Sequence, residues 1–319
     1  MARLFSSRYR SLLLGALLTT VSIQCLAWNQ MGHHVVAAIA YDHLTPQSKM
    51  EVNQWLSHHP DYQRWIKDAS PADRAEIAFI EAASWPDEIK GRADFENDGE
   101  MPKGPESAQN IGFSDHLMHK YWHYVDYGLS LDGTPVQSPY FVNAVTQIRV
   151  LHQALSRSQS SIELKAYDLP WLIHIVADVH QPLHAVSRFT KDEPAGDAGG
   201  NRVKLCEHPC RENLHSFWDD ALGHGKDDEK AVREALRLER RSAEQLGGSD
   251  PEKWAMESFE IAKHYAYDST SIAALTTDIS HPTEEYRRKV HEIAREQAVK
   301  AGLRLAAMIN QEVSDSTHH

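Results

Sequence analysis

Histidine and aspartate residues four positions apart are the first chemical feature of the 319-residue sequence. His174 and Asp178 lie in the stretch WLIHIVADVHQPLH, and His215 and Asp219 lie in NLHSFWDD. Residues at this spacing project from one face of an α-helix. A single pair is more often an ordinary hydrogen bond, but two pairs on different helices are typical of metal ligation between facing helices.

Other residues could join these pairs. The dipeptide at 181–182, Gln-Pro, disfavours continued helix, so we expect His184 to arrive from a turn. His180 lies about 200° around the helix axis from Asp178 and cannot share its face. We interpret His180 as a hydrogen-bond donor at the helix end. Further candidate ligands are Asp87 in ASWPDEIK, His123 in YWHYVDY and His33 in WNQMGHH.

The first 27 residues are typical of a secretory signal peptide, with three arginines before an apolar run and a small residue, Ala27, at the end. An uncleaved membrane anchor is less favoured because the apolar run is short for a membrane span. Cleavage between Ala27 and Trp28 would make Trp28 the N-terminus, whose amine can ligate a metal once deprotonated. We therefore expect a secreted or periplasmic protein.

The charge and the cysteines fit an exported metalloprotein. The net charge is −12, and loss of the three arginines with the signal peptide would leave −15. Such a charge suits anionic partners poorly unless bound divalent cations reverse it locally. Cys206 and Cys210 in CEHPC would then be the remaining cysteines, and we expect them to form a local disulfide. A zinc half-site is the alternative, although no second cysteine pair completes it.

Helical periodicity dominates the rest of the chain. We predict helical starts at Ser70 with Pro71, at Asp168 ahead of Pro170, and at Asp250 with Pro251. The one expected strand is 201–206. Apolar residues recur at three- and four-residue spacing in seven segments, which are 33–44, 71–85, 140–155, 167–180, 230–246, 251–268 and 282–309.

Two long loops, 96–112 and 188–200, are rich in glycine, proline and charge, and such loops often shape a site. We see no internal repeat and no linker that would divide the chain. The sequence therefore predicts one all-α domain over 28–319, whose helices must position the candidate ligands.

Taken together, the motifs resemble the zinc-dependent single-strand-specific nucleases that fungi secrete and that plants use as bifunctional nucleases. These enzymes are relatives of the bacterial zinc phospholipases C. The resemblance rests on Trp28 with His33 five residues later and, in matching order, on SWPDEIK, HYVD, HIVADVHQPLH, GGN and NLHSFWD. It implies a mainly helical domain of the phospholipase C and single-strand nuclease type, with a trinuclear metal site in a cleft between helices.

The resemblance also implies an activity and its metal cofactors. The activity is hydrolysis of single-stranded DNA and RNA to 5′-nucleotides by zinc-activated water attack on phosphorus, with 3′-nucleotidase activity. Histidine and carboxylate ligands without thiolate suit zinc in a hydrolytic site. Three zinc ions are implied, the first bound by Asp87, His123, His174 and Asp178, the second by Asp178, His33 and the backbone amine and carbonyl oxygen of Trp28, and the third by His184, His215 and Asp219.

Other matched residues take catalytic and substrate-binding roles. Asp87 would orient the attacking water, and Lys90 would neutralise charge on the phosphoryl oxygens as a point charge. Asp126 and Asn201 match positions that hydrogen-bond a base edge, and Tyr124 matches an aromatic on which an unpaired base stacks. Tyr124 as a plain core aromatic, and Asp126 as a partner that orients a neighbouring histidine, are the alternatives.

Two other functions compete with this reading. A zinc-dependent phospholipase C is disfavoured by the short interval from Trp28 to His33 and by Asp219, where those relatives carry glutamate. A secreted zinc-sequestering protein without turnover would give the polar residues beside the metals no purpose. We expect single-stranded DNA, RNA and 3′-nucleotides as substrates, no stable membrane association, and a monomer.

Overall fold

The computed structural model describes residues 28–205, 212–239, 248–267 and 282–317. The predicted signal peptide and both cysteines of the predicted disulfide lie outside these residues, so both remain predictions. Among the described residues, no helix combines the length and the apolar character needed to cross a bilayer.

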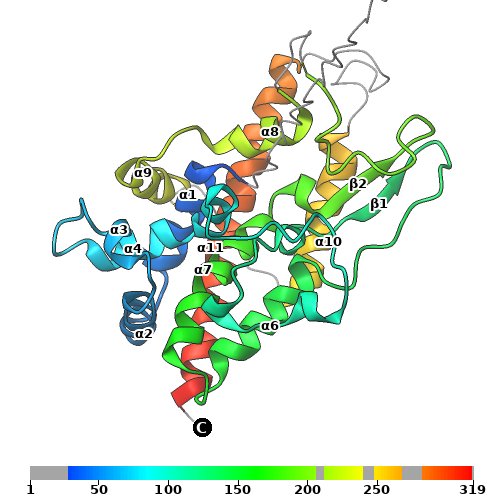
Figure 1. Ribbon diagram of the computed structural model, residues 1–319. Helices are drawn as coiled ribbons and strands as arrows, with labels where there is room; N and C mark the ends of the chain where they lie inside the picture. Colours follow the sequence, from blue (N-terminus) through cyan, green and yellow to red (C-terminus); the bar gives the residue numbers. More distant parts are fainter. Residues whose placement is uncertain (1–27, 206–211, 240–247, 268–281, 318–319) are drawn as a thin grey trace, which may run out of the picture.

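The described residues are mainly helical, as predicted (Figure 1). Their two short strands, β1 (Tyr127–Ser130) and β2 (Val186–Phe189), pair in parallel. The α-helices are α1 (Gln30–Asp42), α2 (Pro46–Ser57), α3 (Tyr62–Trp65), α4 (Arg74–Ala82), α5 (Trp85–Glu88), α6 (Ala144–Ser156), α7 (Ile162–Asp178), α8 (Leu214–Asp219), α9 (Asp228–Glu239), α10 (Pro251–Ile261) and α11 (Glu284–Thr317). Short 3-10 helices that matter below are η1 (Ile89–Gly91), η4 (Lys120–Trp122) and η5 (Pro182–Ala185).

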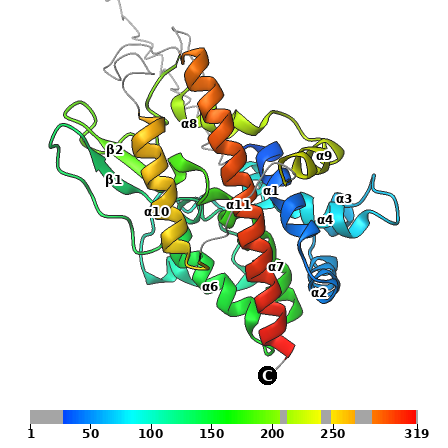
Figure 2. The ribbon, with the colours of Figure 1, turned by 180° about the vertical axis from the view of Figure 1, so that it is seen from behind.

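Helices α1, α7 and α11 form the centre of the molecule (Figures 1 and 2). Helix α1 packs on α4, α9 and α11, while α7 packs on α2, α6 and α11. Every residue of α7 from Lys165 to Asp178 is buried, and so is every residue of α1 from Met31 to Tyr41. Polar side chains on these two helices therefore lie inside the protein, where they need partners.

All seven predicted helical segments contain helices, although the part of 230–246 beyond residue 239 lies outside the described residues. Helix α2 escaped prediction because its apolar positions are few. Its start is nevertheless marked in the sequence, since the Thr45 side chain accepts a hydrogen bond from the Ser48 N–H and Pro46 is its first residue. The predicted start at Asp250 is confirmed, because its side chain caps α10. The predicted start at Ser70 is wrong, because α4 begins at Arg74 and the Ser70 hydroxyl donates to Asp73 instead of capping the helix.

The predicted helical start at Asp168 is wrong. Helix α7 begins six residues earlier, at Ile162, where the Ser161 side chain accepts the N–H of Leu164 at 3.2 Å. The helix then passes through Pro170 without ending. Packing on three other helices outweighs the hydrogen bond that a proline removes.

The predicted strand at 201–206 is also wrong. In its described part, Lys204 makes only an isolated bridge with Asn213. The strands lie instead at 127–130 and 186–189. These four-residue strands are too short to show an alternating pattern in the sequence.

Candidate metal centre

The last two turns of α7 carry the first histidine–aspartate pair. His174 Nε2 lies 3.2 Å from Asp178 Oδ2, and both side chains are fully buried. The Nδ1 of His174 lies 2.7 Å from the carbonyl oxygen of Ala83, to which it donates. That bond leaves Nε2 free to act as a ligand, an arrangement typical of metal-binding histidines.

Three further elements bring ligands to this pair. His33 on α1 places Nε2 3.3 Å from Asp178 Oδ1, and its ring stacks on His174. His123, which follows η4, places Nδ1 3.0 Å from Asp178 Oδ2. Asp87 in α5 places Oδ1 3.7 Å from His174 Nε2. These five side chains form one group, here called the paired cluster, and it unites the residues expected to bind the first two zinc ions.

The second pair belongs to a separate group, here called the single cluster. On α8, His215 Nε2 lies 3.7 Å from Asp219 Oδ2, and it lies 3.1 Å from His184 Nε2 on η5. The Nδ1 atoms of the two histidines donate to backbone carbonyls, His184 to His123 and His215 to Gly199, both at 2.7 Å. Both Nε2 atoms are therefore directed into the cluster.

The electrostatics of both clusters suit cations. Burial, reinforced by neighbouring histidines, lowers the pKa values of His33 and His184, and burial with the nearby Lys90 ammonium lowers that of His123. Neutral imidazoles are the form that binds metal. Burial also raises the pKa of Asp178 to about 6, and His174 offsets this only in part. A nearby divalent cation would favour the ionised carboxylate.

Several buried atoms of the paired cluster have no hydrogen-bond partner among the described residues. They include both ring nitrogens of His33, Nε2 of His123 and Oδ1 of Asp178. Leaving such atoms unpaired is costly. A metal ion would satisfy those that face the cluster, and the nitrogen and oxygen donors without sulfur fit zinc.

Trp28 lies beside both clusters. Its buried indole N–H donates to the carbonyl oxygen of Ala177 at 3.1 Å, one residue before Asp178. The next backbone N–H, of Asn29, donates to the carbonyl oxygen of Asp219 at 3.2 Å. Residues 28 and 29 thus lie between the two ligand-bearing segments. Ligation by the Trp28 amine remains a prediction, because it requires cleavage before this residue.

His180 is separate from both clusters. Its Nδ1 donates to the carbonyl oxygen of Val176 at 2.7 Å, and its Nε2 accepts from Arg304 at 2.9 Å. Burial and the Arg304 charge lower its pKa to about 3. Its predicted role as a hydrogen-bond donor at the helix end is confirmed.

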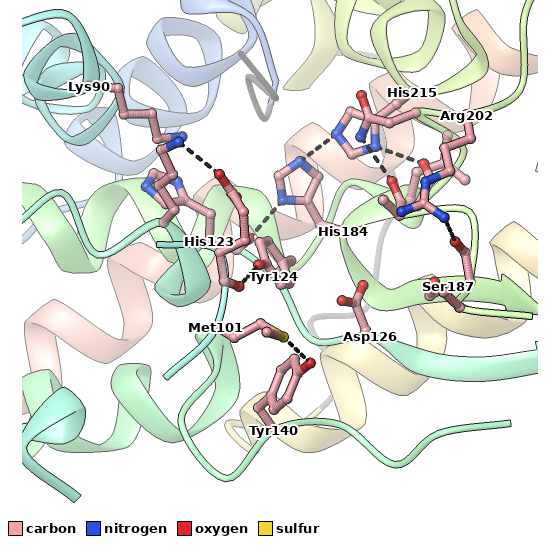
Figure 3. A pocket seen from close by; sticks show the side chains of 18 of the residues that line it. Lys90, Met101, His123, Tyr124, Asp126, Tyr140, His184, Ser187, Arg202 and His215 are labelled. Carbon is pink, nitrogen blue, oxygen red and sulfur yellow. Dashed lines mark hydrogen bonds and ion pairs between the residues drawn. The ribbon is translucent and has the colours of Figure 1, made fainter. Parts of the chain in front are cut away.

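A cavity of about 480 Å³ opens beside the ligands (Figure 3). The residues expected to contact substrate also line it, namely Lys90, Tyr124, Asp126 and Asn201. Ligands of both clusters reach its surface, since His123, His184 and His215 contribute to the lining. In Figure 3, His184 and His215 face each other above Asp126. One cavity therefore gives access to both clusters and to the substrate-binding candidates.

The lining residues are held by specific contacts. Lys90 Nζ lies 2.7 Å from Asp87 Oδ1, and the lysine side chain is only 5% exposed. Tyr124 is half-buried and donates its hydroxyl hydrogen to the carbonyl oxygen of Glu100. Burial, helped by the nearby charge of Asp197, raises the pKa of Asp126 to about 7. The side-chain N–H of Asn201 donates to the Ala198 carbonyl oxygen at 2.9 Å.

Comparison with known proteins identifies the family of the chain. The family model described as S1/P1 Nuclease matches residues 28–314. The chain belongs to the S1/P1 nuclease family. Endonuclease 3 of Arabidopsis thaliana is 23% identical to it over 322 residues, which cover 92% of each chain. Endonuclease 4 of the same plant is 23% identical over 332 residues, covering 95% of this chain and 94% of its own.

Nuclease P1 of Penicillium citrinum is 27% identical over 188 residues, which cover 53% of this chain and 66% of Nuclease P1. The relatives of this S1/P1 family member thus carry nuclease or endonuclease names. The match favours a nuclease over the phospholipase C that the sequence left as an alternative.

One site residue of this S1/P1 nuclease-family chain was missed by sequence reasoning. Gln181 donates from Nε2 to Asp219 Oδ1 at 2.6 Å and accepts the N–H of Leu183 at 2.6 Å. It thereby orients an aspartate of the single cluster and shapes the turn that carries His184. In the sequence the Gln-Pro dipeptide indicates only the end of a helix, and because Asp219 is 38 residues away, no local pattern reveals the role of Gln181.

Proposed function

We propose that this S1/P1-family chain is a secreted trinuclear-zinc phosphodiesterase. It hydrolyses single-stranded DNA and RNA to 5′-nucleotides and removes phosphate from 3′-nucleotides. The observation that supports this most directly is the convergence of both histidine–aspartate clusters on one cavity lined by a tyrosine, a lysine and polar groups. Family membership and the nuclease names of the relatives support the same conclusion.

The paired cluster would hold two zinc ions that share Asp178, and the single cluster would hold the third. The Trp28 amine and carbonyl oxygen would complete the site nearest His33. Bound zinc would supply a Lewis acid for the phosphate oxygens and would lower the pKa of water at the site. Both functions need open coordination positions, and the exposure of His123, His184 and His215 to the cavity is compatible with them.

The protein's own groups would position the reactants. The Asp87 carboxylate would accept a hydrogen bond from the attacking water and direct it at phosphorus. The Lys90 ammonium, already 2.7 Å from Asp87, would neutralise charge that develops on the phosphoryl oxygens. Because the lysine is almost entirely buried, its charge would act more strongly there than in water.

The substrate base would bind in the part of the cavity that Tyr124, Asp126 and Asn201 line. The Tyr124 ring would stack on it, while Asp126 and Asn201 would hydrogen-bond its edge. In a duplex, neighbouring bases already cover the faces of each base, so a stacking residue of this kind favours single strands. Asp126 lines the cavity as a half-buried carboxyl group whose pKa is raised by desolvation, so it could donate as well as accept.

Export would precede this activity. A signal peptide ending at Ala27 would expose the Trp28 amine, and an oxidising compartment would allow a Cys206–Cys210 disulfide. We propose a monomer without stable membrane association, acting on nucleic acid outside the cytoplasm.

The test is expression of the full chain in a secreting host, followed by analysis of the processed protein. We expect an N-terminal Trp28, three zinc ions per chain, and cleavage of single-stranded DNA and RNA to products with 5′-phosphates. Phosphate release from 3′-AMP should accompany it, with little cleavage of duplex DNA. Activity that survives complete chelation would refute the metal mechanism. Release of phosphocholine from phosphatidylcholine without nucleotide release would identify a phospholipase instead.

A further inference from the structure

An irregular segment, residues 92–118, forms one wall of the cavity and is here called the cavity loop. Four of its residues line the cavity, namely Asn97, Glu100, Met101 and Met118. Figure 3 shows Met101 at the edge of the cavity, where its sulfur accepts a hydrogen bond from Tyr140. The loop contains only two single-turn 3-10 helices as regular structure. A bridge between Glu96 and Leu117 joins the two ends of the loop through backbone hydrogen bonds. Between these points, the shape of the loop depends mainly on side-chain contacts.

His119, immediately after the cavity loop, contacts two carboxylates from different parts of the loop. The imidazole Nδ1 lies 3.5 Å from Asp98 Oδ2, and Nε2 lies 3.2 Å from Asp115 Oδ2. The backbone N–H of His119 also donates to Asp98 Oδ1 at 3.0 Å. Asp98 lies next to Asn97 in the wall, whereas Asp115 lies near the end of the loop. A single buried ring thus holds two carboxylates that are 17 residues apart in the sequence.

The backbone of His119 supports a specific role for this ring. Its φ of 44° lies in the left-handed region, which is unfavourable for residues other than glycine. The ring stacks on Trp122 with centroids 3.7 Å apart and planes 2° apart. Strained backbone of this kind persists only where surrounding contacts compensate for it, and it often occurs next to functional sites.

The charges around His119 favour its cationic form. Burial by itself lowers the imidazole pKa, but Asp115 and Asp98 outweigh burial, and the pKa lies above its usual value. The cation also acts on its partner, because the contact with His119 and that with Tyr121 outweigh burial and lower the pKa of Asp98. The described contacts of the ring are with carboxylates and aromatic rings, and none is with a proposed zinc ligand.

We propose that His119 is a positioning residue that holds the cavity loop in the shape that binds substrate. This inference rests on the proposed nuclease function, since it assigns the cavity loop to substrate binding. His119 itself does not line the cavity. It acts through Asp98 on the neighbouring wall residues and through Lys120, which follows it and pairs with Glu100 at 2.7 Å. Its loss should therefore weaken substrate binding more than it slows the chemical step.

The test compares His119→Asn with His116→Asn in zinc-loaded protein. Asparagine tolerates the left-handed conformation but cannot bridge both carboxylates. His116 is the matched control, because it lies three residues before His119 with φ 53°, and its exposed side chain does not line the cavity. We expect His119→Asn to raise KM for a dinucleotide roughly three- to tenfold, with kcat within about twofold of wild type. Zinc content should be unchanged, and His116→Asn should match wild type.

A second variant covers the case in which His119→Asn does not fold. Asp98→Asn keeps an oxygen that can accept the His119 N–H but removes the ion pair, so it should raise KM in the same direction by a smaller factor. Binding of 5′-AMP, measured by calorimetry, should weaken in parallel. Folded variants with wild-type KM and 5′-AMP affinity would overturn the proposal. Parallel loss of zinc and kcat would also overturn it, because His119 would then act on the metal centre.

Failure of the proposed function has a different signature. A zinc-loaded wild-type protein that cleaves no nucleic acid would refute the nuclease activity whatever the variants do. The 5′-AMP affinities would still decide about His119, since weaker binding in His119→Asn than in His116→Asn supports its role and equal binding contradicts it.

Discussion

Helix α7 buries two aspartates in opposite surroundings, Asp168 near its middle and Asp178 at its C-terminal end. Asp168 and Asp178 are both 0% exposed, and burial raises the pKa of each, to about 8 and about 6 respectively. Asp168 receives one hydrogen bond, from Asn110 at 2.9 Å, and no histidine contacts it among the described residues. Asp178 lies within 3.3 Å of His33, His123 and His174.

This difference teaches how one helix can bury two carboxyl groups at acceptable cost. At Asp168 the group stays protonated at neutral pH, so no charge is buried. At Asp178 three imidazoles surround the carboxyl group, and a cation would draw it into the ionised form. The helix is the same, and the neighbours from other elements decide the chemistry.

Replacing Asp178 should produce the largest effect. In Asp178→Asn, the carboxylate shared by two proposed zinc sites is lost. We expect zinc content to fall and activity on single-stranded DNA to drop by more than about a hundredfold, since even residues that only support ligands cost 10–100-fold. Zinc analysis of the purified variant and initial rates measure both effects.

Asp168→Asn is the matched control for this substitution. An amide closely imitates the neutral carboxyl group of Asp168, so zinc content and activity should stay close to wild type. Equal losses in the two variants would mean that both act by destabilising α7, and the distinction between the two aspartates would be wrong.

A free N-terminus at Trp28 should be needed for zinc binding in the paired cluster. Trp28 bonds to Ala177, one residue before Asp178, and its amine is proposed to ligate zinc. A short peptide left ahead of Trp28 removes the free amine, so we expect roughly tenfold or greater loss of activity. The same peptide added after His319 is the control and should have no effect. Full activity of the N-terminally extended protein would exclude the amine as a ligand.

The pairing of His174 with Asp178 could be predicted from the sequence because it depends only on local spacing. His174 and Asp178 are four residues apart, and this spacing fixes their common face once the segment is helical. His215 and Asp219 follow the same rule on α8. The family motifs supplied the remaining ligands, whose meeting across α1, α5 and α7 could not be derived from spacing alone.

The role of Asp168 could not be predicted from the sequence because it depends on a residue far away in the chain. An aspartate two residues before a proline is typical of a helix start, yet Asp168 serves as a buried partner for Asn110, which is 58 residues away. His119 is a similar case, because its two carboxylates meet it only through the folding of an irregular loop. Such contacts depend on tertiary packing, which overrides local patterns.

A substitution of His180 tests whether the paired cluster extends beyond Asp178. It lies two residues beyond Asp178 but bonds to Val176 and Arg304 instead of the cluster. His180→Gln should lower the free energy of unfolding by about 1–2 kcal/mol through the loss of these buried bonds, with zinc content unchanged. Denaturant titration and zinc analysis measure this. The matched comparison is His33→Gln, which should lose zinc, and zinc loss in both variants would extend the cluster to His180.

The smallest expected effect is a pH dependence of stability that comes from Asp168. Because the folded-state pKa of Asp168, about 8, is above the usual value, its contribution to stability is present below about pH 4 and is lost as pH rises towards 8. Asp168→Asn removes this loss. We therefore expect the Tm of the variant, relative to wild type, to increase by roughly 2–5 °C between pH 5 and pH 8. The control is Asp68→Asn, at a side chain that is 88% exposed, which should leave the pH profile unchanged. Parallel Tm profiles for Asp168→Asn and wild type would show that Asp168 ionises at no cost, and that its surroundings do not exclude charge.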